Sequence, residues 1–294
     1  MKTKILAIFA CLLWGSAFAG AKIGFEYTTP LHLSGMRFML AGLLLIPFLI
    51  YQKIDWISNL KEWRYMLLFG FLQTFIQYGF FFMGLNKVPA AISAIIIGGG
   101  PFFVAVMAHF TMGNDRMSFR KILAIVLGMA GIVFISFAKG GSIHTDISFY
   151  YGVILLIISN IVGASTNIIV AKNRNKVSPV MLTAFANFSG GLILYIVSFF
   201  TEDWYVKPYS LEFYIAWIWL ALIPAVGFSI WYSLLKRPEV KVSELNMWKF
   251  VVPVAGVVLS WLLVPGEYPD LYSKESSRTH SRMHPCAPGK LPSV

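Results

Sequence analysis

The feature that most constrains this chain is a series of long apolar runs separated by short polar connections. A helix needs about 20 apolar residues to cross the hydrocarbon layer of a bilayer. Nine segments of this kind follow one another, at residues 5–25, 31–51, 64–85, 90–112, 119–138, 149–171, 179–200, 211–235 and 242–264. The sequence therefore predicts an all-α, polytopic membrane protein in which nine transmembrane helices are present.

Composition agrees with this prediction, because 57% of the residues are hydrophobic and only 13% are charged. Soluble domains carry about 25% charged residues, so this chain has too few to cover a water-facing surface. The net charge of +11 would suit a nucleic-acid-binding protein. The charges lie in short loops between apolar runs, however, so we expect membrane lipid and no nucleic acid as a partner. Cys11 and Cys286 indicate neither a disulfide framework nor a metal site.

The Lys and Arg residues of the connections favour one orientation. With the N-terminus inside, the inner segments carry 14 of these residues, and the outer loops before the tail carry four, namely Lys22, Lys87, Lys139 and Lys207. We therefore expect a multi-pass protein of the cell membrane with a cytoplasmic N-terminus. The cytoplasmic membrane of a bacterium fits this pattern.

The chain contains an internal repeat. Residues 88–119 align without gaps on residues 240–271 at a constant offset of 152, which places Pro101 on Pro253. A second matching block lies earlier in each half. Two independent blocks in the same order argue against coincidence.

In this earlier block Pro30 matches Pro179, and Gly42 matches Gly191 twelve residues beyond the proline. The repeat unit is then five spans. Because five is odd, the second copy must enter the membrane from the opposite side, which is the inverted-repeat plan of many secondary transporters.

From this alignment we expect a tenth span to be missing. The first repeat, residues 1–140, ends with an apolar span from Ile122 to Phe137, whereas the second, residues 149–272, is followed by the polar, proline-containing tail at 273–294. We expect this tail to be disordered. It is either a natural nine-span variant or the product of a reading frame lost near Ser273, and the abrupt change of composition within a repeat favours the lost frame.

Several short motifs resemble EamA-type members of the drug/metabolite transporter superfamily. They are Cys11-Leu12-Leu13-Trp14-Gly15-Ser16, Met36-Arg37-Phe38 after Pro30, and the two blocks around Pro101 and Pro253. The resemblance covers about residues 5–272. It implies a ten-helix inverted-repeat carrier, often one that exports amino acids or related metabolites. This sequence departs from that pattern by lacking the tenth helix, which puts the activity of the product in doubt.

Two ionisable residues within the spans are candidates for substrate binding, because inserting such a group costs about 2.5–3.5 kcal/mol. Arg37 could hold a carboxylate with its paired donors. The alternatives are a structural pair with Glu26 or a side chain that reaches the outer surface, and the resemblance, which places an arginine here whatever the substrate, favours a structural role. Lys249 precedes Pro253 by four residues, and it either faces a cavity or reaches the inner interface.

Uncharged polar residues form stripes on the third and sixth spans, and they either join helices or line a polar path. Two tryptophans could supply a cavity wall. The predicted substrate-binding residues are therefore Trp14, Arg37, Gln73, Gln77, Asn160, Asn167, Trp231 and Lys249. The Gly98-Gly99-Gly100-Pro101 motif predicts a break in the fourth span, as a hinge or as a place of close packing.

These features predict a secondary transporter that exports a small metabolite, such as an amino acid or a related compound. The spans contain no pair of carboxylates, no His-rich motif and no nucleotide-binding motif, so we expect no enzyme activity, no cofactor and no metal. The alternatives are an inactive, truncated transporter product and, less well supported, a membrane-embedded enzyme or a channel. A small-molecule substrate is the expected partner, and a homodimer is left open.

Overall fold

The computed structural model describes residues 2–123, 125–127, 130, 146–203 and 208–263. The first half contains α1 (Lys2–Phe25), α2 (Pro30–Leu44), α3 (Ile46–Tyr51), α4 (Trp56–Leu60), α5 (Trp63–Gly70), the π-helix η1 (Phe71–Gln77), α6 (Tyr78–Lys87), α7 (Ala90–Gly98) and α8 (Gly100–Thr111). The second half contains α10 (Ile147–Lys172), α11 (Pro179–Thr201), α12 (Leu211–Leu235), α13 (Val242–Met247), the 3-10 helix η2 (Trp248–Phe250) and α14 (Val251–Leu263).

Eight helical stretches in the described part of the chain are long and apolar enough to cross a membrane. They coincide with eight of the nine predicted spans, so the chain is an all-α, multi-pass membrane protein, as predicted. The remaining predicted span, at 119–138, lies largely outside the described residues. The tail at 273–294 and the end of the second predicted repeat also lie outside them.

The helices begin where the sequence supplies the appropriate residues. Pro30 and Pro179 stand at the first turns of α2 and α11, where a missing N–H costs nothing. The Asp146 side chain accepts a hydrogen bond from the Phe149 N–H at 2.9 Å and so caps α10.

Four of the spans are interrupted. The second was predicted as one helix over 31–51, but α2 ends at Leu44 and α3 begins at Ile46, next to Pro47. The third contains η1, the fourth is divided at Gly99 between α7 and α8, and the ninth predicted span contains η2. The break in the fourth span agrees with the prediction from its glycines and proline.

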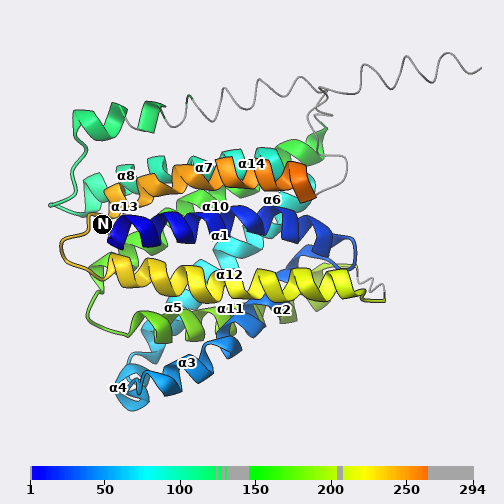
Figure 1. Cartoon of the computed structure of the whole chain (residues 1–294), viewed down its shortest axis with the longest axis horizontal. Helices are drawn as coiled ribbons and strands as arrows, with labels where there is room; N and C mark the ends of the chain where they lie inside the picture. The colour runs from blue at the N-terminus through cyan, green and yellow to red at the C-terminus, as the bar shows by residue number, and fades with distance from the viewer. Residues whose placement is uncertain (1, 124, 128–129, 131–145, 204–207, 264–294) are drawn as a thin grey trace, which may run out of the picture.

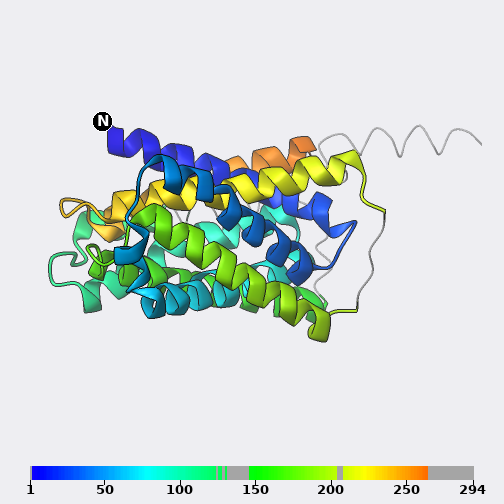
Figure 2. The ribbon, with the colours of Figure 1, turned by 90° about the horizontal axis from the view of Figure 1, so that it is seen from below.

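The helices pack into one bundle, in which α1 lies between α12 and α14 (Figure 1). On the other side of the bundle α2 packs against α11, and α10 packs against α6 and α8. Figure 2 shows the same bundle from below, with the long helices running between its two ends and several of them inclined to one another.

Glycines bring α2 and α11 into close contact. A Cβ atom on Gly42 would lie 2.7 Å from the carbonyl oxygen of Ala184, and one on Gly191 would lie 2.7 Å from the backbone nitrogen of Met39. A Cβ on Gly35 would lie 2.6 Å from the backbone nitrogen of Tyr195. The two backbones therefore touch at several points along the crossing, as small residues permit in membrane bundles.

The first helices of the two halves run in opposite directions. Near the end of α1, Lys22 Nζ donates to the Val88 carbonyl oxygen at 2.9 Å, just beyond α6. Next to it, the Lys87 side chain reaches the Ser148 hydroxyl at 3.4 Å, at the start of α10. The end of α1 and the start of α10 therefore lie at the same end of the bundle.

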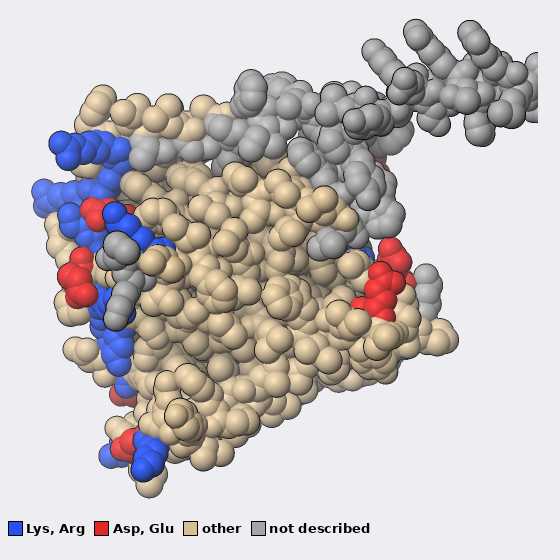
Figure 3. Space-filling model, in the orientation of Figure 1, with Lys and Arg blue, Asp and Glu red and all other residues tan. Residues whose placement is uncertain are grey.

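The outer surface is apolar between two charged ends. Large side chains such as Ile154, Ile196 and Ile215 are exposed along the helices, which suits contact with lipid. Lys and Arg gather at the end where α1 begins, and a cluster of Asp and Glu lies at the opposite end (Figure 3).

Candidate functional site

A cavity of about 100 Å³ lies inside the bundle, lined by residues from both halves of the chain. One water needs roughly 10–15 Å³ measured in the same way, so the space accommodates a small solute. All eight residues predicted from the sequence line this one cavity: Trp14, Arg37, Gln73, Gln77, Asn160, Asn167, Trp231 and Lys249. Their role in substrate binding stays a prediction.

Arg37 is 2% exposed and projects from α2 into this cavity. Its guanidinium carbon lies 4.4 Å from the ring centre of Phe38, 4.9 Å from that of Phe82 and 5.6 Å from that of Tyr78. Its Nε and Nη1 atoms have no hydrogen-bond partner among the described residues. Neither a pair with Glu26 nor a side chain reaching the surface is therefore observed.

Lys249 lies in η2 and also faces the cavity rather than the interface. Its ammonium group is 4.8 Å from the ring centre of Trp231 and 5.5 Å from that of Trp14. These distances are typical of cation–π contacts. Trp231 is held in turn by Asn167, whose Oδ1 atom accepts a hydrogen bond from Trp231 Nε1 at 2.8 Å.

Gln73 and Gln77 lie in η1, where the backbone leaves the regular α-helical pattern. The hydroxyl of Ser159 on α10 donates to the Gln77 carbonyl oxygen at 2.9 Å. Single π-helical turns often occur at functional sites, because they rotate the side chains that follow and free backbone groups. Here the segment presents both amide side chains to the cavity.

Asn160 stabilises the break in the fourth span. Its Nδ2 atom donates to the Ile96 carbonyl oxygen at 2.8 Å, and the same carbonyl accepts the Gly99 N–H at 3.1 Å. Pro101 has no N–H to continue the helix at this point. The cavity is thus bordered by η1, η2 and the α7–α8 break, three places where α-helical hydrogen bonding is interrupted.

Several residues of the cavity were not predicted, including Tyr78, Ser159, Thr166 and Phe228. Ser159 and Thr166 flank the predicted amides of α10, so a wider polar stripe could have been recognised. The aromatic residues gave no signal, because rings are frequent on every span of this chain.

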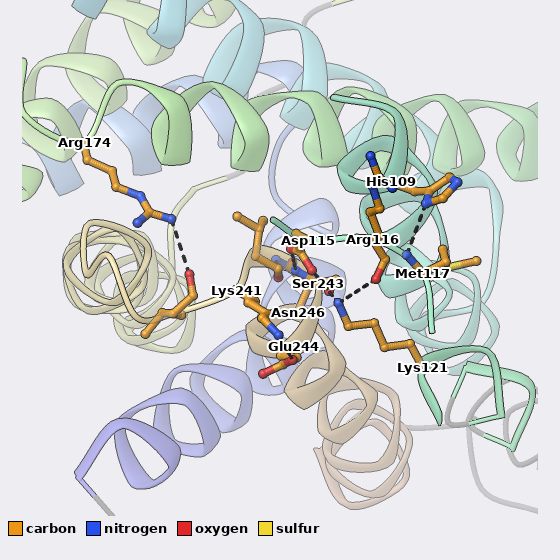
Figure 4. Close-up of polar contacts among 12 residues, drawn as sticks. His109, Asp115, Arg116, Met117, Lys121, Arg174, Lys241, Ser243, Glu244 and Asn246 are labelled. Atoms are coloured by element: carbon orange, nitrogen blue, oxygen red, sulfur yellow. Dashed lines mark hydrogen bonds and ion pairs between the residues drawn. The ribbon is translucent and has the colours of Figure 1, made fainter. Parts of the chain in front are cut away.

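A second polar cluster joins the two halves at the end of the bundle where α1 begins (Figure 4). Asp115 is 2% exposed, and its Oδ1 atom accepts hydrogen bonds from Lys121 Nζ and from the Ser243 hydroxyl, both at 2.5 Å. Its Oδ2 atom accepts the Ser243 N–H at 2.8 Å, so the carboxylate caps the first turn of α13.

The electrostatic balance at Asp115 favours the charged form. Burial raises the pKa of this carboxyl group, but the hydrogen bonds from Lys121 and Ser243 outweigh that effect and hold the pKa below its ordinary value of 3.8. Asp115 was not among the residues predicted from the sequence. His109 lies nearby, exposed, and accepts the Met117 N–H at 3.2 Å.

The fold and the cavity define a polytopic membrane carrier in which both halves of the chain line one internal cavity that contains charged and amide side chains. The chain belongs to the EamA-like transporter family, which it matches over residues 1–137 and 150–275. It is accordingly a transporter-family protein and not an enzyme.

Relatives of known sequence agree with this assignment. An uncharacterized transporter of Bacillus subtilis (strain 168), YvbV, is 25% identical over 260 residues, which covers 88% of this chain and 83% of that protein. A probable amino-acid metabolite efflux pump of Escherichia coli (strain K12) is 24% identical and covers 90% of this chain and 87% of its own length. A crystal structure 18% identical in sequence superposes with a TM-score of 0.74 over 91% of both chains, which supports the fold.

Proposed function

We propose that this protein is a secondary transporter that exports a small metabolite, such as an amino acid or a related compound, across the cytoplasmic membrane. The observation that carries the proposal is the cavity within the bundle, in which Arg37, Lys249 and four amide side chains are supplied by both halves of the chain. The similarity to a probable amino-acid metabolite efflux pump supports the direction and the substrate class.

The proposal includes an inverted repeat of two five-helix units, with nine of ten helices present. The opposite directions of α1 and α10 support it, as do contacts that occur in matching pairs. Packing of α1 against α12 corresponds to packing of α10 against α6, and packing of α1 against α14 corresponds to packing of α10 against α8. Access to the cavity would alternate between the two sides as one set of helices moves against the other.

The proposal includes a cytoplasmic N-terminus. Lys and Arg are concentrated at the end of the bundle where α1 begins (Figure 3). An excess of these residues marks the cytoplasmic side of membrane proteins.

The test is a transport assay with the purified full-length chain in proteoliposomes, using a panel of radiolabelled amino acids and related metabolites. We expect exchange of at least one compound above empty liposomes. Arg37→Lys and Gln77→Ala should reduce it, whereas Lys172→Met, at the exposed end of α10, should not. A chain that moves no compound of the panel contradicts the proposal, and intact transport in both cavity variants contradicts the site.

The predicted loss of the tenth helix has its own experiment. A second chain, in which residues 273–294 are replaced by an apolar span, is assayed beside the first. Transport by the extended chain alone would identify the present product as an inactive, truncated transporter. Light scattering of the purified protein in detergent would test the homodimer.

A further inference from the structure

The polar groups that the cavity leaves without partners are hydrogen-bond donors. Arg37 Nε and Nη1 are buried and have no partner among the described residues, and the same is true of Trp14 Nε1. Both side chains line the cavity. A buried donor without an acceptor is costly, and a buried cation without a counter-ion more so, which makes an acceptor-rich ligand the natural complement.

The two charges that line the cavity have the same sign. Arg37 and Lys249 both face it, and no Asp or Glu is among the described residues of its lining. The ion pairs found in the described part of the chain involve other lysines, at the end of the bundle. Because like charges repel, an anion in the cavity would stabilise both cations.

Two of the amide oxygens that an ammonium group could use already accept hydrogen bonds. Asn167 Oδ1 already accepts from Trp231 at 2.8 Å and from Asn246 at 3.4 Å. Gln73 Oε1 accepts from a neighbouring hydroxyl at 3.4 Å. The ring faces of Trp14 and Trp231, which attract cations, already hold Lys249. A second positive charge beside Lys249 is therefore disfavoured.

A series of aromatic rings joins the two cations. From Lys249 it passes through Trp14 to Phe228, with ring centres 5.5 Å apart, and then to Tyr78 at 5.8 Å. Tyr78 in turn lies 5.6 Å from the Arg37 guanidinium carbon. Such a surface suits a flat or apolar group lying between charged positions.

We propose that the cavity selects organic anions, in which an acidic group pairs with Arg37 or Lys249 and an apolar or aromatic body lies along the rings. This inference rests on the proposed transport function and narrows its substrate class. An acid is favoured over the corresponding zwitterionic amino acid, and the amino acid over the corresponding amine.

The test uses three compounds that share one skeleton and differ in charge: 3-phenylpropanoate, phenylalanine and 2-phenylethylamine. Each is titrated into the purified full-length chain in detergent, and binding is followed by tryptophan fluorescence, because Trp14 and Trp231 line the site. We expect 3-phenylpropanoate to bind most tightly and 2-phenylethylamine most weakly, with at least a tenfold difference between them. This is about what one charge-assisted hydrogen bond provides.

Variants then assign the charges. Lys249→Met and Arg37→Met should each weaken 3-phenylpropanoate binding about tenfold, whereas Lys172→Met should leave it unchanged. Size-exclusion chromatography establishes whether each variant is folded. If Arg37→Met does not fold, Lys249→Met alone tests the proposal, because Lys249 is the less buried of the two cations.

The outcomes separate the two proposals. Tighter binding of phenylalanine or 2-phenylethylamine, or no saturable binding of the anion at millimolar concentration, overturns the anion proposal even if transport of another solute is found. Anion binding without transport of any compound in proteoliposomes leaves the anion site standing and contradicts the transport function.

Discussion

Replacing Asp115 by asparagine should destabilise the protein strongly, although the two side chains are nearly the same size. The carboxylate is almost fully buried and accepts three hydrogen bonds, one from Lys121 and two from Ser243. Asparagine keeps one acceptor oxygen, but its amide NH₂ group would face Lys121 or Ser243, which donate hydrogen bonds to the carboxylate. The change also leaves Lys121, which is 8% exposed, without its counter-ion.

Breaking a buried ion pair from one side costs about 3–5 kcal/mol. We therefore expect Asp115→Asn to lower the free energy of unfolding by about that amount. Adding Lys121→Met should restore part of the loss, because an apolar side chain needs no counter-ion. The measurement is unfolding of the full-length chain in mixed micelles with increasing dodecyl sulfate, followed by circular dichroism.

Glu244 provides a matched control, because it pairs with Lys241 at 3.4 Å while both side chains are about half exposed. Glu244→Gln should cost less than about 1 kcal/mol, as expected of a surface pair. If Asp115→Asn also costs less than about 1 kcal/mol, or if Lys121→Met lowers stability further in that background, the ion pair does not stabilise the fold as we reason.

Three further predictions concern stability and can be measured in the same way. Since the pKa of Asp115 is below its ordinary value in the folded chain, the stability that this carboxylate contributes is present above pH 3.8 and is lost as the pH falls through the lowered pKa. Unfolding curves of Asp115→Asn at decreasing pH should therefore show a smaller acid-induced loss of stability than those of the unchanged chain. Gly42→Ala should cost about 1–3 kcal/mol, because the new Cβ would meet the Ala184 carbonyl oxygen, whereas Gly113→Ala, with open space around it, should be near neutral. Asn160→Leu should cost only about 1 kcal/mol, because the Ile96 carbonyl retains a second donor; a loss above about 3 kcal/mol would show that the amide has a larger role.

Much of the architecture could be predicted because hydrocarbon imposes a simple requirement on length and polarity. Polar side chains within spans are costly unless they face the interior. For that reason Gln73, Gln77, Asn160 and Asn167 could be recognised from the sequence as polar stripes on the third and sixth spans, and the structure brings all four to one cavity. Their chemistry alone did not distinguish helix-joining amides from a binding site.

Other features depend on contacts that a sequence does not display. The π-helical segment at η1 has no local signature, because it contains neither proline nor glycine. The partner of Asp115 on α13 is 128 residues distant. Arg37 illustrates a third case, since the sequence offered Glu26 as a partner, and only the packing of Phe38 and Phe82 around the guanidinium shows a different environment.

The glycine-lined crossing of α2 and α11 limits how this molecule can move. Where two backbones touch directly, no layer of side chains can change rotamer to allow sliding or rotation. We expect the two helices to travel together as a rigid body throughout the transport cycle. Bending would then be confined to the segments whose hydrogen bonding is already interrupted, three of which, η1, η2 and the α7–α8 break, border the cavity.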